Sequence, residues 1–250
     1  MSDVPETHPR YLSLKMRDAV VAGVEQEITS VHGLIAHGRG EAFDYLLGEQ
    51  TQPFAREAAQ AAAAMLRRAR HPVISVNGNA AALAPEQMAE LGRALEAPLE
   101  VNIFHASKER EEQMRAHLLA AGADGVLMPT AAAQLTGMES NRRFVNPEGI
   151  FRADVVFVPL EDGDRCEALR GMGKEVVTVD LNPMSRTARR ASVTIVDNLV
   201  RALPVLIGEV RRLADSSPET LDEMLATYRH DAVLGAALQC IRAGGLDTSG

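Results

Sequence analysis

Residues 153–197 read ADVVFVPLEDGDRCEALRGMGKEVVTVDLNPMSRTARRASVTIVD, in which three short apolar runs alternate with polar segments. The runs, at 153–160, 175–181 and 193–197, are rich in β-branched residues, which favour strands. The polar segment after the first run has the composition of a helix. Apolar strands joined by helices are typical of parallel sheets buried on both faces. The stretch therefore predicts consecutive βαβ units with right-handed crossovers.

The same alternation extends toward the N-terminus. Helical patterns at 85–96 and 107–121 lie between further apolar, strand-like runs. Those runs are 71–78, 99–104 and 125–129. A looser segment rich in Asn, Arg and Gly follows, up to residue 150. We therefore expect an α/β fold with a Rossmann-like, mostly parallel sheet and flanking helices over about 71–210.

Helical segments are also expected at both ends of the chain. An amphipathic pattern covers 8–28, and an alanine-rich helix covers 53–70. We expect one domain over residues 1–250, with a helical N-terminal part (1–70), the α/β core (about 71–210) and C-terminal helices (211–250). The final residues, 246–250, are expected to fray.

The first helix carries two arginines on its apolar face. The apolar residues Leu12, Met16, Val20, Val24 and Ile28 recur every fourth position. At about 100° per residue, Arg17 and Arg10 fall on the same stripe. A buried cation needs an anionic partner, so each arginine is expected to meet a carboxylate of the protein or a ligand.

A second segment, GLIAHGRGEAFDYLLGE (33–49), places Arg39 between two glycines. We interpret it as an anion-binding loop, in which bare backbone lets a ligand approach the guanidinium. Glu41 to Leu47 are expected to begin a helix, and Glu41 is explained as a first-turn acid favoured by the helix dipole. His37 is a candidate for the same site, although a lone histidine is more often structural.

Composition narrows the function classes. The chain has 250 residues, of which 46% are apolar, and its formal net charge is −8. That charge argues against general nucleic-acid binding. Two cysteines do not suggest a disulfide framework or a metal knuckle. There is no signal-type apolar segment and no run near 18 apolar residues, so we expect a soluble, cytoplasmic protein without a membrane span.

Ligands of open parallel sheets bind beyond the carboxyl ends of the strands. Asn77 and Asn79 follow the predicted strand 71–78, either as turn formers or as site residues. After strand 153–160 come Glu161, Asp162 and Asp164. They are candidates for magnesium or substrate contacts, with Asp164 alternatively the N-cap of the next helix.

Two more strand ends carry polar residues. Asp180 and Asn182 follow the strand at 175–181, and Ser185 is placed to cap a short helix that begins with Arg186. A helix N-terminus beside a guanidinium is suited to an oxyanion. After strand 193–197, Asp197 is the predicted N-cap of the following helix.

Common catalytic signatures are absent. The sequence contains no GxxxxGK[ST] loop, no GxGxxG after a strand, no HExxH and no GxSxG. A Rossmann-type oxidoreductase is therefore disfavoured, and the histidines have no metal-binding spacing. A noncatalytic module that binds ATP or a phosphorylated metabolite would need similar Arg and Gly residues, so it stays as an alternative to an enzyme.

Several segments together resemble the archaeal 4-phosphopantoate–β-alanine ligases, also called phosphopantothenate synthetases. The likeness runs from about residue 5 to beyond 200. The segments are HPRY (8–11), GLIAHGRGEAFDYLLGE (33–49), SVNGN (75–79), VPLEDGDR (158–165), VDLNPMSRTAR (179–189) and TIVDN (194–198). These strings are long and compositionally unusual, so the resemblance is specific.

The resemblance implies a Rossmann-like homodimeric ligase of coenzyme A biosynthesis. Such enzymes join 4-phosphopantoate to β-alanine through an acyl-adenylate, releasing AMP and pyrophosphate, with Mg²⁺ accompanying ATP. The resemblance also implies the ATP-binding residues: Arg17, Arg39, Asp180, Leu181, Asn182, Arg186, Thr187, Asn198 and Leu199.

The positive charges of two residues in this set suggest catalytic roles. We expect Arg39 and Arg186 to act catalytically, because planar cations stabilise charge that develops on phosphates. Asn77, Asn79, Asp162 and Asp164 are the candidates for binding the other substrates. No protein residues are assigned as metal ligands. The apolar helix around 232–241 is the candidate for a dimer interface.

Overall fold

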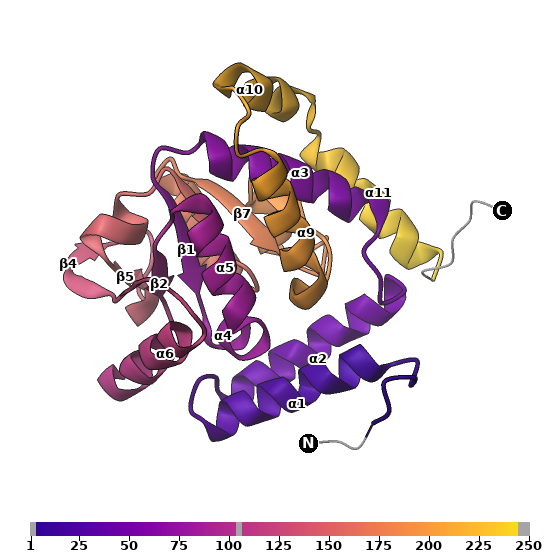
Figure 1. Cartoon of the computed structure of the whole chain (residues 1–250), viewed down its shortest axis with the longest axis horizontal. Coiled ribbons are helices and arrows are strands. Elements are labelled where there is room, and N and C mark those ends of the chain that lie inside the picture. Colours follow the sequence, from indigo (N-terminus) through magenta and orange to yellow (C-terminus); the bar gives the residue numbers. More distant parts are fainter. Residues whose placement is uncertain (1–3, 104–106, 245–250) are drawn as a thin grey trace.

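The computed structural model describes residues 4–103 and 107–244, with a six-stranded sheet at its centre (Figure 1). The strand order is β3-β2-β1-β6-β7-β8, and all neighbouring strands are parallel. The strands are β1 Pro72–Val76, β2 Leu99–Val101, β3 Val126–Leu127, β6 Val155–Phe157, β7 Glu175–Val179 and β8 Val193–Ile195. Counted along the chain, the order within this sheet is 3-2-1-4-5-6. It is the doubly wound order of Rossmann folds, which confirms the predicted fold class.

Helices cover both faces of this sheet. On one face lie α3 (Pro53–Arg68), α5 (Pro85–Leu95) and α9 (Leu199–Arg212), with α6 (Lys108–Ala120) beside β2 and β3. On the other face lies α7 (Gly163–Gly171). The remaining helices of this part are α4 Gly78–Leu83, α8 Arg186–Arg190, α10 Pro218–Thr227 and α11 His230–Arg242. The alanine-rich α3, predicted as part of an N-terminal helical region, thus belongs to the main core.

Each strand supplies side chains to both layers. On β6, Val155 and Phe157 join the apolar cluster beneath α3, α5 and α9. Their neighbours Val156 and Val158 join the cluster that includes Leu169 of α7. Successive strand residues point to opposite faces. A sheet covered on both sides therefore requires the continuous apolar runs seen in the sequence.

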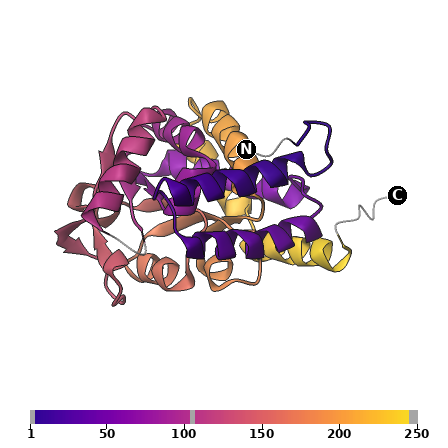
Figure 2. The ribbon, with the colours of Figure 1, turned by 90° about the horizontal axis from the view of Figure 1, so that it is seen from below.

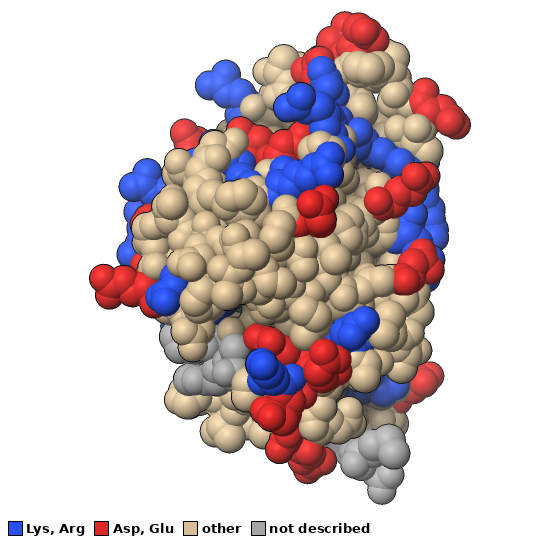
Figure 3. All heavy atoms as spheres, turned by 90° about the vertical axis from the view of Figure 1, so that its left-hand side faces the viewer, with Lys and Arg blue, Asp and Glu red and all other residues tan. Residues whose placement is uncertain are grey.

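An arm between β3 and β6 completes the second face. The segment predicted as loose contains an antiparallel pair, β4 (Thr130–Gln134) and β5 (Phe144–Val145). The short turn η1 (Asn141–Arg143) lies between these strands, and η2 (Pro147–Phe151) follows β5. Its Leu135 and Val145 are buried with Val156 of the sheet. Short, mostly alanine strands carry little periodic signal, so sequence patterns missed them. On the face that contains this arm and α6, charged side chains of both signs lie around a broad uncharged area (Figure 3).

The N-terminal segment forms a helical hairpin of α1 (Tyr11–Glu25) and α2 (Val31–Leu46), which lie side by side (Figures 1 and 2). The predicted loop around Arg39 is therefore wrong, because α2 already begins at Val31, whereas the helix expected from Glu41 is confirmed as far as Leu46. Gly38 and Gly40 lie inside this helix, with space around Gly38 and Leu181 near Gly40. Helix α1 contacts α4, and α2 contacts α11.

Two predictions fall partly or wholly outside the described residues. The last residue of the predicted strand 99–104 and the proposed fraying of 246–250 lie outside the described residues. None of the helices within 4–103 and 107–244 is long and apolar enough to cross a membrane.

Candidate functional site

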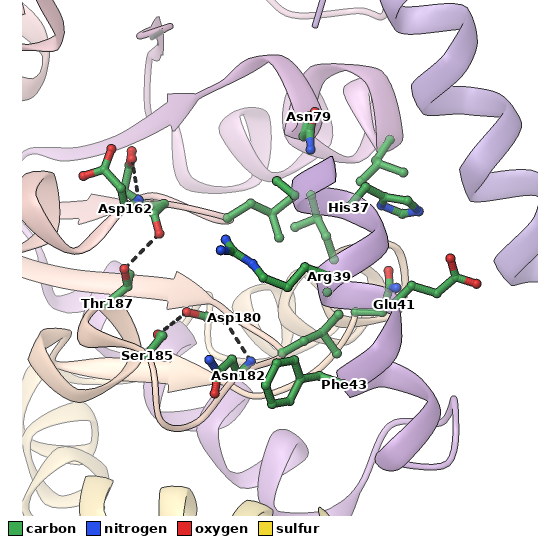
Figure 4. Close-up of a pocket in the computed structure, with 18 of the residues that line it drawn as sticks. His37, Arg39, Glu41, Phe43, Asn79, Asp162, Asp180, Asn182, Ser185 and Thr187 are labelled. Carbon is green, nitrogen blue, oxygen red and sulfur yellow. Dashed lines mark hydrogen bonds between the residues drawn. The ribbon is translucent and has the colours of Figure 1, made fainter. Parts of the chain in front are cut away.

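A cavity of about 420 Å³ lies at the carboxyl ends of β6, β7 and β8, where α2 passes over them (Figure 4). The strand-end loops contribute Leu160 to Gly163, Asp180 to Asn182, and Asn198 with Leu199. Helix α2 contributes Arg39 and Phe43 from the opposite side. The cavity thus lies where open α/β sheets bind ligands, and its volume suits a small molecule.

Arg39 extends from α2 into this cavity (Figure 4). Among the described residues its guanidinium makes no hydrogen bond or ion pair. An unpaired planar cation that lines a cavity is suited to bind a phosphate or carboxylate through two parallel hydrogen bonds. The predicted anion-binding role of Arg39 is thus compatible with the structure, although a helix rather than a loop presents it.

A buried ion network fixes the C-terminal half of α2 to the sheet. Asp44 of α2 accepts hydrogen bonds from Asn198 Nδ2 at 2.9 Å and from the guanidinium of Arg201. Arg201 also pairs with Asp197 at 2.7 Å, and Asp197 accepts from the Thr51 hydroxyl at 2.6 Å. Asp44 and Asp197 are both 1% exposed. This network holds α2, and with it Arg39, at a set distance from the end of β8.

The N-cap of α9 is Asn198, whose side chain accepts from the Val200 N–H. The prediction that Asp197 caps this helix is therefore wrong. Asp197 faces inward to Arg201 and Thr51 instead, because a buried carboxylate requires charged and hydrogen-bonding partners. Sequence spacing could not distinguish two adjacent polar residues.

The loop after β7 is organised by Asp180. Its carboxylate accepts hydrogen bonds from the Ser185 hydroxyl and, at 2.9 Å, from the Asn182 N–H. Burial raises the pKa of Asp180, against the lowering effect of these hydrogen bonds and of Arg39. Asp180 therefore shapes the loop and places a carboxylate on the cavity wall near Arg39.

Ser185 caps α8 as predicted, since its side chain accepts from the Ala188 N–H at 2.8 Å. Arg186 begins the helix, lines the cavity and pairs with Asp164. A Cβ on Gly163 would lie 2.5 Å from Arg186 Nε and 2.6 Å from its Cβ. Only glycine at this position lets Arg186 pack so closely against the start of α7. Thr187, also on the cavity wall, donates to the Glu161 carbonyl at 2.8 Å.

Arg17 lies outside the cavity lining, paired with Glu41. Arg17 Nε donates to Glu41 Oε2 at 2.9 Å and Nη2 to Oε1 at 2.8 Å. Its side chain is 50% exposed, so the predicted burial on an apolar face is wrong, although the expected carboxylate partner is present. Of the expected stripe, Met16, Val20 and Ile28 are buried and Leu12 is exposed, while Ser13 and Gly23 are buried as well. The buried face of α1 therefore combines part of the apolar stripe with small residues.

Glu41 is therefore not a first-turn acid. It lies within α2 and accepts hydrogen bonds from Arg10, Ser13 and Arg17 of α1. His37, one turn earlier, points away from Arg39 (Figure 4), and its Nε2 is buried without a partner among the described residues. Burial lowers the pKa of His37, which favours the neutral ring.

The acidic turn after β6 is an ion network, and Asp162 rather than Asp164 caps α7. Asp162 accepts from the Arg165 N–H at 2.8 Å. Glu161 pairs with Arg142 and, at 2.6 Å, with Arg165. Burial alone would raise the pKa of Glu161, but Arg142 and Arg165 lower it to about 2. These carboxylates are occupied by arginines, and no group of three metal-binding side chains occurs in the described parts of the chain.

Asn77 and Asn79 both bind the protein itself. Asn77 caps α4 and donates to the Pro159 carbonyl at 2.8 Å. Asn79 accepts from the Thr29 hydroxyl at 2.6 Å and donates to the Gly33 carbonyl at 2.9 Å. These bonds tie the α1–α2 hairpin and β6 to the end of β1, so both side chains have structural roles whether or not they also contact a ligand.

The structure gathers most of the predicted site around one cavity. Of the predicted ATP-binding residues all except Arg17 line it, and Asn79 and Asp162 do so as well, whereas Asn77 and Asp164 do not. Sequence reasoning missed Phe43, which lines the cavity, and Arg142, which supports its floor. The spacing of Phe43 four residues after Arg39 on α2 could have identified it. Arg142 comes from the arm, where no periodic pattern marked a structural role.

Comparison with known proteins supports a single family. Residues 54–244 match the family model described as phosphopantothenate/pantothenate synthetase. The 4-phosphopantoate–beta-alanine ligase of Thermococcus kodakarensis is 48% identical over 243 residues, which cover 97% of this chain and 93% of that protein. The protein of the same name from Methanosarcina mazei is 48% identical over 242 residues, covering 97% and 95%.

A third relative agrees. The 4-phosphopantoate–beta-alanine ligase of Thermococcus onnurineus is 47% identical over 245 residues, which cover 97% of this chain and 93% of that protein. These matches confirm the resemblance noted in the sequence, over nearly its whole length. The chain belongs to the phosphopantothenate/pantothenate synthetase family.

Proposed function

We propose that this chain is an ATP-dependent ligase that joins 4-phosphopantoate to β-alanine, and that it does so through an acyl-adenylate. Its family membership supports the substrates, because similar proteins carry the name of that reaction. The observation that carries the nucleotide assignment is the Arg39 guanidinium, which lines a cavity at the carboxyl ends of β6, β7 and β8 and has no partner within residues 4–103 and 107–244. The product would be 4′-phosphopantothenate, on the route to coenzyme A.

The first step would form the mixed anhydride. A carboxylate oxygen of 4-phosphopantoate attacks the α-phosphorus of ATP, and the bond to the bridging oxygen breaks to release pyrophosphate. Both reactants are anions, so the chain must offset their repulsion. Arg39 and Arg186 would hold phosphate oxygens and stabilise the charge that develops on pyrophosphate.

The second step would transfer the acyl group. The β-alanine amine attacks the acyl carbon, the bond to the AMP oxygen breaks, and the amine nitrogen loses its proton. No protein nucleophile is needed, because the activated group forms on the substrate. Most of the rate enhancement would then come from positioning and electrostatics.

Magnesium would enter bound to ATP. Four carboxylates line the cavity, and all of them already accept hydrogen bonds from the protein: Glu41, Glu161, Asp162 and Asp180. Mg²⁺ retains waters and binds phosphate oxygens readily. We therefore expect its ligands to be mainly phosphate and water, with the arginines supplying the remaining positive charge.

One assay tests the proposal. Purified protein is mixed with ATP, Mg²⁺, 4-phosphopantoate and β-alanine, and the products are identified by mass spectrometry. We expect AMP and 4′-phosphopantothenate in equal amounts. ADP in place of AMP would replace the adenylate by an acyl phosphate. Nucleotide binding without either product would favour the noncatalytic binding module.

We further propose that the protein forms a homodimer, as the family resemblance implies, through α1 and α2. Helix α11, the predicted interface, instead buries Val233, Leu234 and Ala237 within its own chain. The α1–α2 hairpin exposes six large apolar side chains: Leu12, Val21, Val31, Ile35, Tyr45 and Leu46. Sedimentation equilibrium should give a dimer that Ile35→Glu converts to monomer. An unchanged mass for this variant would place the interface elsewhere.

A further inference from the structure

Helix α8 presents Arg186 and Thr187 to the cavity, yet it has only five residues. Isolated helices shorter than about 12 residues are marginal in water. The position of α8 must therefore be fixed by contacts with other parts of the chain. Two of these contacts act on its first turn, the Ser185 cap and the hydrogen bond from Thr187 to the Glu161 carbonyl. The second half of the helix requires contacts of its own.

The carbonyl oxygen of Ala188 is the point where this second half is held. The hydroxyl of Thr194 on β8 donates to it at 2.9 Å, and Nε2 of His230, the first residue of α11, lies 2.8 Å from it. Ala188 and Thr194 are both fully buried. A carbonyl oxygen has two lone pairs, and buried ones are hydrogen-bonded. Thr194 and His230 together satisfy both lone pairs of this one.

The contact with Ala188 determines which nitrogen of His230 carries the proton. A carbonyl oxygen can only accept a hydrogen bond, so Nε2 must donate, and Nδ1 of the neutral ring is then an acceptor. The Tyr228 hydroxyl lies 3.3 Å from Nδ1 and is the donor to it. Burial raises the pKa of Tyr228, so the hydroxyl keeps the proton that it donates. Tyr228 thus orients the imidazole, and the imidazole holds α8.

Helix α11 is itself firmly placed. Its Val233 and Leu234 are buried in the apolar cluster that fills the main core, and the helix contacts α2 and α3 as well as α8. Helix α2 carries Arg39, and α8 carries Arg186. One C-terminal helix therefore contacts both of the elements that present a guanidinium to the cavity.

We propose that His230 is a positioning residue for the nucleotide site, which holds α8 through Ala188 so that Arg186 and Thr187 meet ATP in a set geometry. This inference rests on the proposed assignment of those two residues to ATP. His230 does not line the cavity, so it acts through α8 and not by contact with the nucleotide. The C-terminal helices are then part of what shapes the site, although they lie outside the α/β core.

The test compares two substitutions of His230. Glutamine keeps an N–H group that can reach the Ala188 carbonyl, whereas leucine fills the space without a donor. In His230→Leu we expect the Kd for ATP, measured by calorimetry, to rise about tenfold, because a buried carbonyl loses one of its donors. The KM for 4-phosphopantoate should stay at the wild-type value. His230→Gln should bind ATP within about threefold of wild type, since it restores the donor.

Amide hydrogen exchange measures the opening of α8 without any nucleotide. The N–H groups of Ala188 and Ala191 donate to Ser185 Oγ and to the Thr187 carbonyl. Their exchange should be about tenfold faster in His230→Leu and unchanged in His230→Gln.

Leu221→Ala is the control for a general loss of stability. Leu221 is buried in the core from α10 and supplies no hydrogen bond to α8. Its truncation should lower the melting temperature, because a buried side chain is lost. The affinity of the folded protein for ATP and the exchange of α8 should match wild type.

Three outcomes would overturn the proposal. Wild-type ATP affinity in His230→Leu would mean that α8 needs no support from α11. Equal weakening in His230→Leu and His230→Gln would assign the effect to packing of the ring and not to its N–H group. Faster exchange of α8 with unchanged ATP affinity would show a structural contact that does not serve the nucleotide. If wild type itself binds no ATP, the ligase assignment fails, and this inference fails with it.

Discussion

Glu41 on α2 and Arg17 on α1 form a bidentate ion pair, with Arg17 Nε and Nη2 at 2.9 and 2.8 Å from the two carboxylate oxygens. Arg10 and Ser13 donate to the same carboxylate. Glu41 also lines the cavity that contains Arg39. The pair therefore connects the outer helix of the hairpin to the wall of the site, and it places Arg17 next to the cavity rather than in it.

Replacing Glu41 by Gln should destabilise the hairpin in a pH-dependent way. Burial raises the pKa of Glu41, but hydrogen bonds from Arg17, Ser13 and Arg10 outweigh it and lower the pKa from 4.5 to about 2. A carboxyl whose pKa is lowered by folding stabilises the protein above its unfolded pKa and loses this effect as pH falls. We expect a loss of about 1–2 kcal/mol at pH 7, since Arg17 is half exposed and partly screened.

Thermal melts of wild type and Glu41→Gln across pH measure this effect. The difference in stability should shrink as pH falls from about 4.5 toward 2. Glu25→Gln, at an exposed position of α1, is the control and should show no such convergence. A constant difference at all pH values would mean that packing, not charge, underlies the loss.

We expect the ion network at Asp44 to contribute both to the free energy of unfolding and to the kcat. Asp44→Ala removes the acceptor of Asn198 Nδ2 and one of the two carboxylates that pair with Arg201, which keeps Asp197. Breaking a buried pair typically costs about 3–5 kcal/mol, and we expect a loss near the lower end of this range. Because α2 would then be free to shift relative to β8, we expect the kcat to fall further than the remaining folded fraction explains. Chemical denaturation measures the loss of stability. Steady-state kinetics at a temperature about 20 degrees below the melting temperature of the variant measure the kcat of the folded protein.

The exposed Asp215→Ala should leave both quantities unchanged. If Asp44→Ala were destabilised but fully active as the folded species, the network would hold the fold together without positioning Arg39.

Gly163→Ala should disturb Arg186 specifically. The new Cβ would lie 2.5 and 2.6 Å from Arg186 Nε and Cβ, so the arginine or the start of α7 must move. Overpacking of this kind costs about 1–3 kcal/mol. We expect a rise of about tenfold in the KM for ATP, measured at saturating acid and amine. Gly171→Ala, at the other end of α7, has nothing within 4 Å and is the matched control. Equal kinetics in the two variants would remove Arg186 from the nucleotide site.

Apolar runs predicted the sheet well because a strand buried on both faces is apolar at most positions. Val156 and Phe157 pack into the apolar clusters on opposite faces of the sheet, so both appear in the apolar run of the sequence. The antiparallel arm was missed because β4 is mostly alanine and β5 has only two residues. Its position is determined by packing against Val73 and Val156, which no local pattern contains.

The sequence likewise predicted some features of the site and missed others. Strand ends identified Asp180 and Asn182 because the topology brings all carboxyl ends to one edge. Glycines beside Arg39 suggested a loop, yet the contacts of α2 with α1, α4 and α11 override that weak propensity. The sequence placed the N-cap roles of Asp162 and Asn198 on the nearby Asp164 and Asp197. Which of several neighbouring polar residues caps a helix depends on the backbone geometry, and the sequence does not show that geometry.

The most direct test of the nucleotide site is Arg39→Lys. Lysine keeps the charge and helix propensity but cannot present two parallel N–H groups to a phosphate. Removal of one preorganised donor commonly costs 10²–10³ in rate. We expect a loss of about a hundredfold in kcat/KM for ATP, with an unchanged melting temperature because Arg39 has no partner among the described residues. Arg56→Lys, on the exposed side of α3, should behave as wild type. Kinetics of Arg39→Lys within threefold of wild type would mean that ATP does not contact Arg39, and the nucleotide would then have to lie on the Arg186 side of the cavity alone.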